Sequence, residues 1–124
     1  DRQFNLMDEK NSNIINLIGK TSVKDLASLL KFSRKNISFD SGIMHLSDAI
    51  NSNLIAIFGP TNINKNKPKN PNSVSIYKKH YCSPCIVGWY FDENYISEKE
   101  AYNNCKINFE CMNSIDIDEI INQI

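Results

Sequence analysis

The feature that most constrains the fold is a five-residue apolar run, Leu-Ile-Ala-Ile-Phe at residues 54–58, which ends at Gly59-Pro60. Uninterrupted apolar runs of this length, closed by turn residues, are typical of parallel strands that helices cover on both faces. Parallel neighbours need a crossover connection, which is usually a helix. The run therefore predicts an α/β sheet built from alternating strands and helices.

Other segments supply the strands of that sheet. Residues 13–18 form a β-branched run that ends at Gly19, and a shorter run follows at 37–39. Residues 62–73 are rich in Asn, Pro and Lys, a composition that predicts an exposed loop which does not pack. We expect a last strand at residues 73–77.

Helical spacing predicts three helices between and after these strands. Apolar residues recur at i, i+3, i+4 and i+7 over 23–32, behind Ser22 and Asp25, which resemble a capping box. Ile43, Leu46 and Ile50 also repeat at helical spacing, which predicts a helix over 43–50. A helix near the C-terminus is indicated by the capping pair Asp116 and Glu119, and by Ile115 and Ile120 at the positions of a hydrophobic staple.

Length and charge set the limits of function. A chain of 124 residues is long enough for one core and one domain. Its 14 basic and 14 acidic residues cancel, which removes the electrostatic argument for nucleic acid binding. No apolar run approaches the roughly 20 residues that cross a bilayer. The start has neither an initiator Met nor a secretory signal, so we expect a piece of a longer protein.

The turn at Asp40-Ser41-Gly42 carries the clearest chemistry. Ligands of open parallel sheets bind beyond the carboxyl ends of the strands, where this turn is expected. Ser41 can cap the following helix, Gly42 has no Cβ to block a ligand oxygen, and free amides there attract an anion. His45, one turn later, can donate to the same anion. Capping alone, with a structural histidine, also explains these residue types.

A second turn, Phe58-Gly59-Pro60-Thr61, is expected beside the first one, at the next strand end. It offers a small residue and a hydroxyl to the same crevice. It can equally be a plain strand terminator.

These motifs resemble one family. The stretches at residues 16–22 (Asn-Leu-Ile-Gly-Lys-Thr-Ser), 40–46 (Asp-Ser-Gly-Ile-Met-His-Leu) with Ala49, and 58–61 are similar, in order and interval, to the C-terminal half of glycosyltransferase family 9, the lipopolysaccharide heptosyltransferases. The spacing of the four cysteines and Met112 near the C-terminus also resembles a branch of that family.

The resemblance implies a fold and a role for each site residue. It implies the C-terminal half of a GT-B enzyme, a Rossmann-like, three-layer parallel sheet, and an inverting, metal-independent transfer of heptose from an ADP-activated donor to the lipopolysaccharide core. Asp40 would contact donor sugar hydroxyls, and Ser41, Gly42 and His45 would hold the diphosphate. Lys20 and Thr21 would lie by the nucleotide base, with Gly59 and Thr61 also binding substrate.

The resemblance also implies missing parts. The general base, an Asp, belongs to an N-terminal half that is absent here, so we expect no catalytic residue in this chain and no activity alone. Residues 1–81 would be a nucleotide-sugar-binding core, incomplete at its N-terminal side, and residues 82–124 a cysteine segment on the same domain.

The partners that the resemblance implies are the nucleotide sugar, a lipopolysaccharide core or other glycan acceptor, and the missing half. The location that it implies is the cytoplasm or the inner face of the bacterial inner membrane. Two alternative functions are open. One is a GT-B transferase that uses another nucleotide sugar, and the other is a non-catalytic, metal-stabilised module that binds a nucleotide or phosphate.

Cys82 and Cys85 form a C-x2-C pair, and Cys105 and Cys111 follow without that spacing. Four thiolates can bind a structural zinc ion tetrahedrally. Reduced buried thiols and disulfides are the other two possibilities, although disulfides rarely persist in a reducing cytosol. The resemblance implies that the chemistry itself requires no cofactor.

Overall fold

The computed structural model describes residues 13–86 and 96–124, and its centre is a three-stranded parallel sheet. The strands are β1 (Asn36–Phe39), β2 (Leu54–Phe58) and β3 (Val74–Tyr77), in the spatial order β1-β2-β3. Asn36 pairs with Leu54, and Ile55 pairs with Val74, so all three strands end at the same edge. The predicted α/β, Rossmann-like parallel architecture is confirmed.

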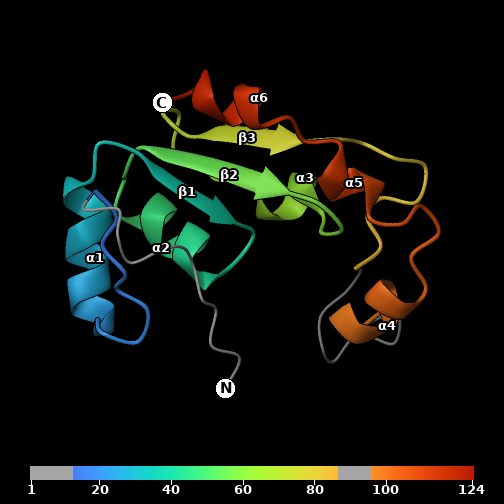
Figure 1. The fold of residues 1–124 in the computed structure, drawn as a ribbon, viewed down its shortest axis with the longest axis horizontal. Helices are drawn as coiled ribbons and strands as arrows, with labels where there is room; N and C mark the ends of the chain where they lie inside the picture. The colour runs from blue at the N-terminus through green and yellow to red at the C-terminus, as the bar shows by residue number, and fades with distance from the viewer. Residues whose placement is uncertain (1–12, 87–95) are drawn as a thin grey trace.

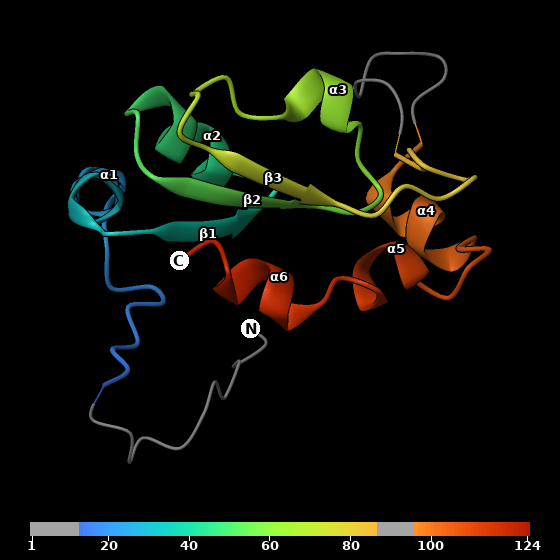
Figure 2. The same cartoon turned by 90° about the horizontal axis from the view of Figure 1, so that it is seen from above.

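Helices lie on both sides of this sheet. In Figure 2, α2 (Gly42–Ala49) and α3 (Ile63–Asn66) lie on one side, and α5 (Glu110–Asn113) and α6 (Ile117–Ile121) lie on the other. Every residue of β2 is buried, as expected for a central strand with two covered faces. The sheet therefore forms the middle of three layers.

The core forms where β2 meets α2. Leu54, Ala56 and Phe58 alternate along one face of β2 and pack with Met44 of α2, and each of these four side chains is fully buried. Ile63 of α3 packs against the same cluster. The core therefore fixes α2 and α3 to the strand that Gly59 follows.

The helix α1 (Val23–Phe32) begins and ends as predicted. Ser22 accepts a hydrogen bond from the Asp25 amide, and the Asp25 carboxylate accepts from the Ser22 amide, which completes the capping box. Leu30 is its buried residue. Local sequence signals were sufficient to define this helix because the box satisfies amides at its first turn.

The strand predicted at residues 13–18 is wrong. These residues form no strand, and Ile14 and Ile15 are 51% and 79% exposed. A strand needs a neighbour, and in the described part of the chain β1 pairs only with β2. Gly19 has a φ of 71°, which suits the turn closed by the Lys20 amide and the Leu17 carbonyl oxygen.

The prediction of an unpacked loop at residues 62–73 is also partly wrong. Asn62 caps α3 by accepting from the Asn64 amide. The Asp48 carboxylate accepts hydrogen bonds from the Lys69 and Asn70 amides, and Asn70 is buried. Side chains that bond to the backbone order this polar segment without an apolar face.

The C-terminal helix is present as α6, with Asp116 as its cap. Asp116 accepts from the Asp118 amide, while Glu119 forms an ion pair with Lys78 rather than returning to the cap. The remaining helix, α4 (Glu98–Asn103), lies with α5 beyond the arrowheads of the strands (Figure 1). In the described residues, no helix is long and apolar enough to cross a membrane.

Candidate functional site

The predicted turn lies at the carboxyl end of β1 and opens directly into α2. Asp40 follows the strand, Ser41 occupies the N-cap position, and Gly42 is the first residue of the helix. Both Ser41 and Gly42 are exposed. A Cβ added at Gly42 would meet nothing within 4 Å, so the space in front of this helix end is open.

Ser41 has the backbone conformation of a cap, but its side chain makes no capping hydrogen bond. Its hydroxyl lies 3.2 Å from the Ser38 hydroxyl instead. The capping role considered for this side chain is therefore wrong, and the amides at the start of α2 are not occupied by Ser41. Such amides, together with the helix dipole, favour an anion.

His45 lies one turn into α2 with its side chain 58% exposed. Its Nε2 is 3.7 Å from Oδ1 of Asp40, whose side chain is only 9% exposed. The imidazole is therefore accessible to a ligand at the helix end, whereas the Asp40 carboxylate is nearly buried.

Asn66 contacts the other oxygen of the same carboxylate. Its Nδ2 donates a hydrogen bond of 2.8 Å to Oδ2 of Asp40. The sequence analysis missed Asn66, because it lies in a segment that was expected to be an unpacked loop. No local sequence signal marks this residue, because the contact joins positions 26 residues apart.

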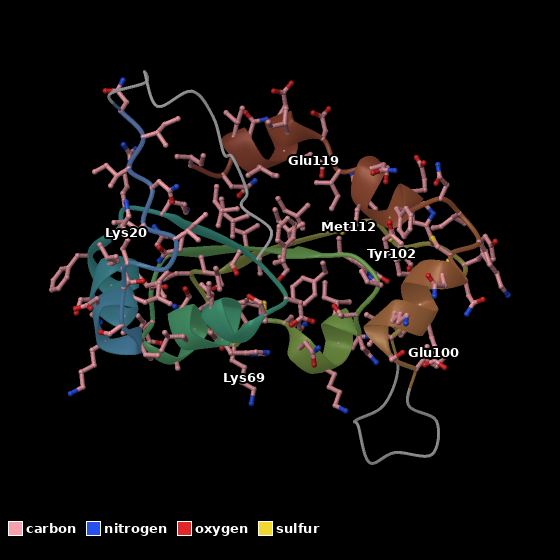
Figure 3. The ribbon with its side chains drawn as sticks, turned by 60° about the horizontal axis from the view of Figure 1, so that its bottom comes forward. Lys20, Lys69, Glu100, Tyr102, Met112 and Glu119 are labelled. Carbon is pink, nitrogen blue, oxygen red and sulfur yellow. The ribbon has the colours of Figure 1, made fainter. Side chains whose placement is uncertain are left out.

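A cavity of about 430 Å³ adjoins Asp40 beyond the strand ends. One wall comes from the two predicted turns and the last residues of the strands, namely Phe39, Asp40, Ile57, Gly59, Pro60 and Thr61. The opposite wall comes from the cysteine segment, namely Cys85, Ile86, Ala101, Tyr102, Cys105, Ile107, Phe109, Cys111 and Met112. Figure 3 shows Tyr102 and Met112 near each other on that wall.

The cavity wall is mainly apolar, with few polar groups. Among the described residues, the buried hydroxyl of Thr61 has no hydrogen-bond partner. The rings of Tyr102 and Phe109 pack with their centroids 4.7 Å apart. The structure thus brings Gly59 and Thr61 to the same end of the sheet as Asp40, as the sequence predicted.

Gly59 lies where the strand ends touch the cysteine segment. It is buried, and an added Cβ would lie 2.2 Å from Sδ of Met112. The Pro60 carbonyl oxygen accepts hydrogen bonds from the Cys85 and Ile86 amides. These contacts fix the cysteine segment against the end of β2.

Lys20 and Thr21 do not line the cavity at this edge. Figure 3 places Lys20 beside α1, at the opposite end of the sheet from Met112. Lys20 is exposed and Thr21 is half-buried. Their predicted contact with a nucleotide base therefore stays a prediction.

The four cysteines lie near one another as free thiols. Burial, followed by the neighbouring Cys82 thiol, raises the pKa of Cys85 to about 11. Burial and then the Cys105 thiol raise the pKa of Cys111. Within the described ranges, no three Cys, His, Asp or Glu side chains are arranged to hold a metal ion. The structural zinc ion stays a prediction, and no argument below depends on it.

Comparison with known proteins supplies the family. The model of glycosyltransferase family 9 (heptosyltransferase) matches residues 2–94. The chain belongs to glycosyltransferase family 9. The match covers both turns at the strand ends, so the family resemblance of these motifs is confirmed.

Individual relatives agree with this assignment. Over 84 residues, 67% of this chain, the sequence is 34% identical to lipooligosaccharide heptosyltransferase 2 of Campylobacter jejuni serotype O:2. It is 40% identical over 47 residues to the Haemophilus influenzae protein of the same name, covering 38% of this chain and 14% of that protein. The chain spans about a quarter of the length of the Campylobacter relative. No solved structure matches it significantly.

Proposed function

We propose that this family 9 chain forms the donor-binding part of an inverting heptosyltransferase of lipopolysaccharide core synthesis. The donor is an ADP-heptose-like nucleotide sugar, and the acceptor is a lipopolysaccharide core or a related glycan. The general base belongs to an N-terminal half outside this sequence, so the chain binds donor without completing the transfer. The role rests on the family together with one observation, the open start of α2 beside a nearly buried carboxylate.

The diphosphate would bind at the start of α2. Ser41, Gly42 and His45 are exposed residues there, and the N-cap residue Ser41 makes no side-chain capping hydrogen bond. Charge builds on the departing diphosphate during transfer, and preorganised donors lower the barrier by stabilising that charge. Losing one such donor costs a factor of about 100 to 1,000 in rate.

The sugar would bind on the Asp40 side of this site. A carboxylate accepts hydrogen bonds from hydroxyls, and Asp40 lines the cavity beyond the strands. One ligand can therefore have its diphosphate at the helix and its sugar at the cavity. This arrangement predicts that the sugar adds affinity beyond that of ADP alone.

The test is an NMR titration of the 124-residue chain with ADP and with ADP-heptose. We expect His45→Ala to weaken binding of both ligands by at least about tenfold, since one hydrogen bond to a charged group contributes about 1.5–3 kcal/mol, a factor of roughly 10 to 150. His80→Ala is the matched control, because the sequence has only two histidines and His80 lies after β3, outside the turn and helix that carry His45. Unchanged binding in His45→Ala, or equal binding of every nucleotide without regard to the sugar, would contradict the proposal.

A further inference from the structure

The hydrogen bond between Asn66 and Asp40 joins two elements that are far apart in the sequence. The side-chain Nδ2 of Asn66 lies 2.8 Å from Oδ2 of Asp40, across 26 positions of the chain. A carboxylate can only accept, so the donor here must be the Asn66 amide group. Hydrogen bonds to an ionised acceptor are among the stronger ones in proteins.

The short helix α3 holds Asn66 in this position. Asn62 caps the helix, and the backbone N–H of Asn66 donates to the Asn62 carbonyl oxygen at 3.0 Å. Ile63, on the same helix, packs against the core cluster of β2 and α2. The backbone of Asn66 is therefore fixed relative to the strand ends, and its side chain is half-buried.

The two oxygens of Asp40 consequently have different surroundings. Oδ2 is bonded to Asn66, whereas Oδ1 has the His45 Nε2 at 3.7 Å, beyond hydrogen-bond distance. A carboxylate held at one oxygen cannot rotate freely about its terminal bond. The oxygen left available to a ligand is Oδ1, next to the histidine at the start of α2.

We propose that Asn66 is a positioning residue that orients the Asp40 carboxylate for the sugar hydroxyls of the donor. This inference rests on the proposed function, and it adds a residue that determines preference for the sugar over the bare nucleotide. Asn66 acts through Asp40 and does not touch the diphosphate. Its loss therefore lowers the affinity for the nucleotide sugar and leaves that for ADP unchanged.

The experiment compares dissociation constants of ADP and ADP-heptose, measured by NMR titration of the 124-residue chain. We expect Asn66→Ala to weaken ADP-heptose binding about tenfold and to change ADP binding less than about twofold. Asn66→Asp keeps the side-chain volume, places a second carboxylate against the first, and should weaken ADP-heptose binding further. Asn64→Ala, an exposed substitution on the same helix, should leave both constants unchanged.

A double-mutant cycle separates positioning from a merely structural role. In an Asp40→Asn background, Asn66→Ala should have little further effect on ADP-heptose binding, because the group that it orients has been altered. An equal loss in both backgrounds, or a wild-type preference for the sugar that survives Asn66→Ala, would overturn the inference. A wild-type chain with no preference for ADP-heptose over ADP would instead contradict the proposed function, and the role of Asn66 would fall with it.

Discussion

Gly59 determines how closely the cysteine segment approaches the end of β2. A Cβ at this position would lie 2.2 Å from Sδ and 2.9 Å from Cγ of Met112. Both atoms belong to a long side chain that has other rotamers, so the clash can be relieved in part. The sequence indicated a small residue at this turn but not the methionine that requires it.

We expect Gly59→Ala to lower the free energy of unfolding by about 1–3 kcal/mol, the usual cost of overpacking. Met112→Ala should remove the obstacle, so the double variant should lose less stability than the sum of the two single variants. Denaturant unfolding measures all three. Additive losses of unfolding free energy would show that there is no steric clash between the added methyl group and Met112.

The Cys85 thiol has a pKa of about 11 because of burial and then the adjacent Cys82 thiol. Thiolates, not thiols, react with iodoacetamide, so Cys85 should stay nearly unreactive at pH 8 and react faster as the pH rises towards 11. Because the folded chain favours the protonated thiol of Cys85, the raised pKa adds to the stability of the folded state below about pH 9. This contribution to stability is lost as the pH rises through 11.

Alkylation followed by mass spectrometry, in the folded chain and in denaturant, measures this reactivity. Full modification of Cys85 at pH 8 in the folded chain would contradict the burial argument. Reactivity that appears only after a chelator is added would support the predicted zinc ion instead.

At the scale of elements, local signals identified most of the sheet and its helices. The apolar run of β2, the capping box of α1 and the spacing in α2 all rest on neighbours within a few residues, and each was predicted at nearly the observed bounds. The run at residues 13–18 has the same local character, but a strand also needs a partner. The sequence of one segment does not specify which strand it pairs with, so that strand was predicted wrongly.

In the site, too, local sequence signals predict some residues, whereas others depend on contacts between distant segments. The turn at Asp40-Ser41-Gly42 and its link to α2 follow from short-range chemistry. The wall formed by Tyr102, Phe109 and Met112 depends on how the cysteine segment folds back, and no sequence spacing indicated it. For the aromatic residues Trp89, Tyr90 and Phe91, the sequence predicts a place in the core or at an interface with the missing half, and they lie outside the described residues.

The Asp48 carboxylate makes several of the hydrogen bonds that hold the polar segment after α3. Oδ1 and Oδ2 of Asp48 accept from the Lys69 amide at 3.0 and 3.1 Å, and Oδ1 also accepts from the Asn70 amide at 2.9 Å. The donor of Lys69 is its backbone amide, and Figure 3 shows its side chain pointing away from the sheet.

We expect Asp48→Ala to lower the free energy of unfolding by about 1–3 kcal/mol, because two amides lose a charged acceptor. Asp48→Asn, which keeps one accepting oxygen, should cost less. Asp118→Ala, at an exposed carboxylate on α6, should change stability by less than about 0.5 kcal/mol. Thermal unfolding compares the three, and an Asp48→Ala variant as stable as the control would show that the segment is held by other contacts.

For the molecule as a whole, the three layers bring two different surfaces to one edge of the sheet. One is the open, amide-bearing start of α2, and the other is the mainly apolar cavity between the strand ends and the cysteine segment. Asp40 lies at their junction, held by Asn66 from a third element. A nucleotide sugar has the matching parts, a diphosphate for the helix and hydroxyls for the carboxylate.

The central claim is that the diphosphate binds at the amides that begin α2. Gly42 tests it most directly, because a Cβ added there meets nothing within 4 Å beyond its chain neighbours and its own helix, so we expect the substitution to leave the fold intact. In an NMR titration with ADP-heptose, we expect shifts at residues 40–45 in the wild-type chain and a loss of binding of at least about tenfold in Gly42→Val. Wild-type affinity in a folded Gly42→Val chain would contradict the account.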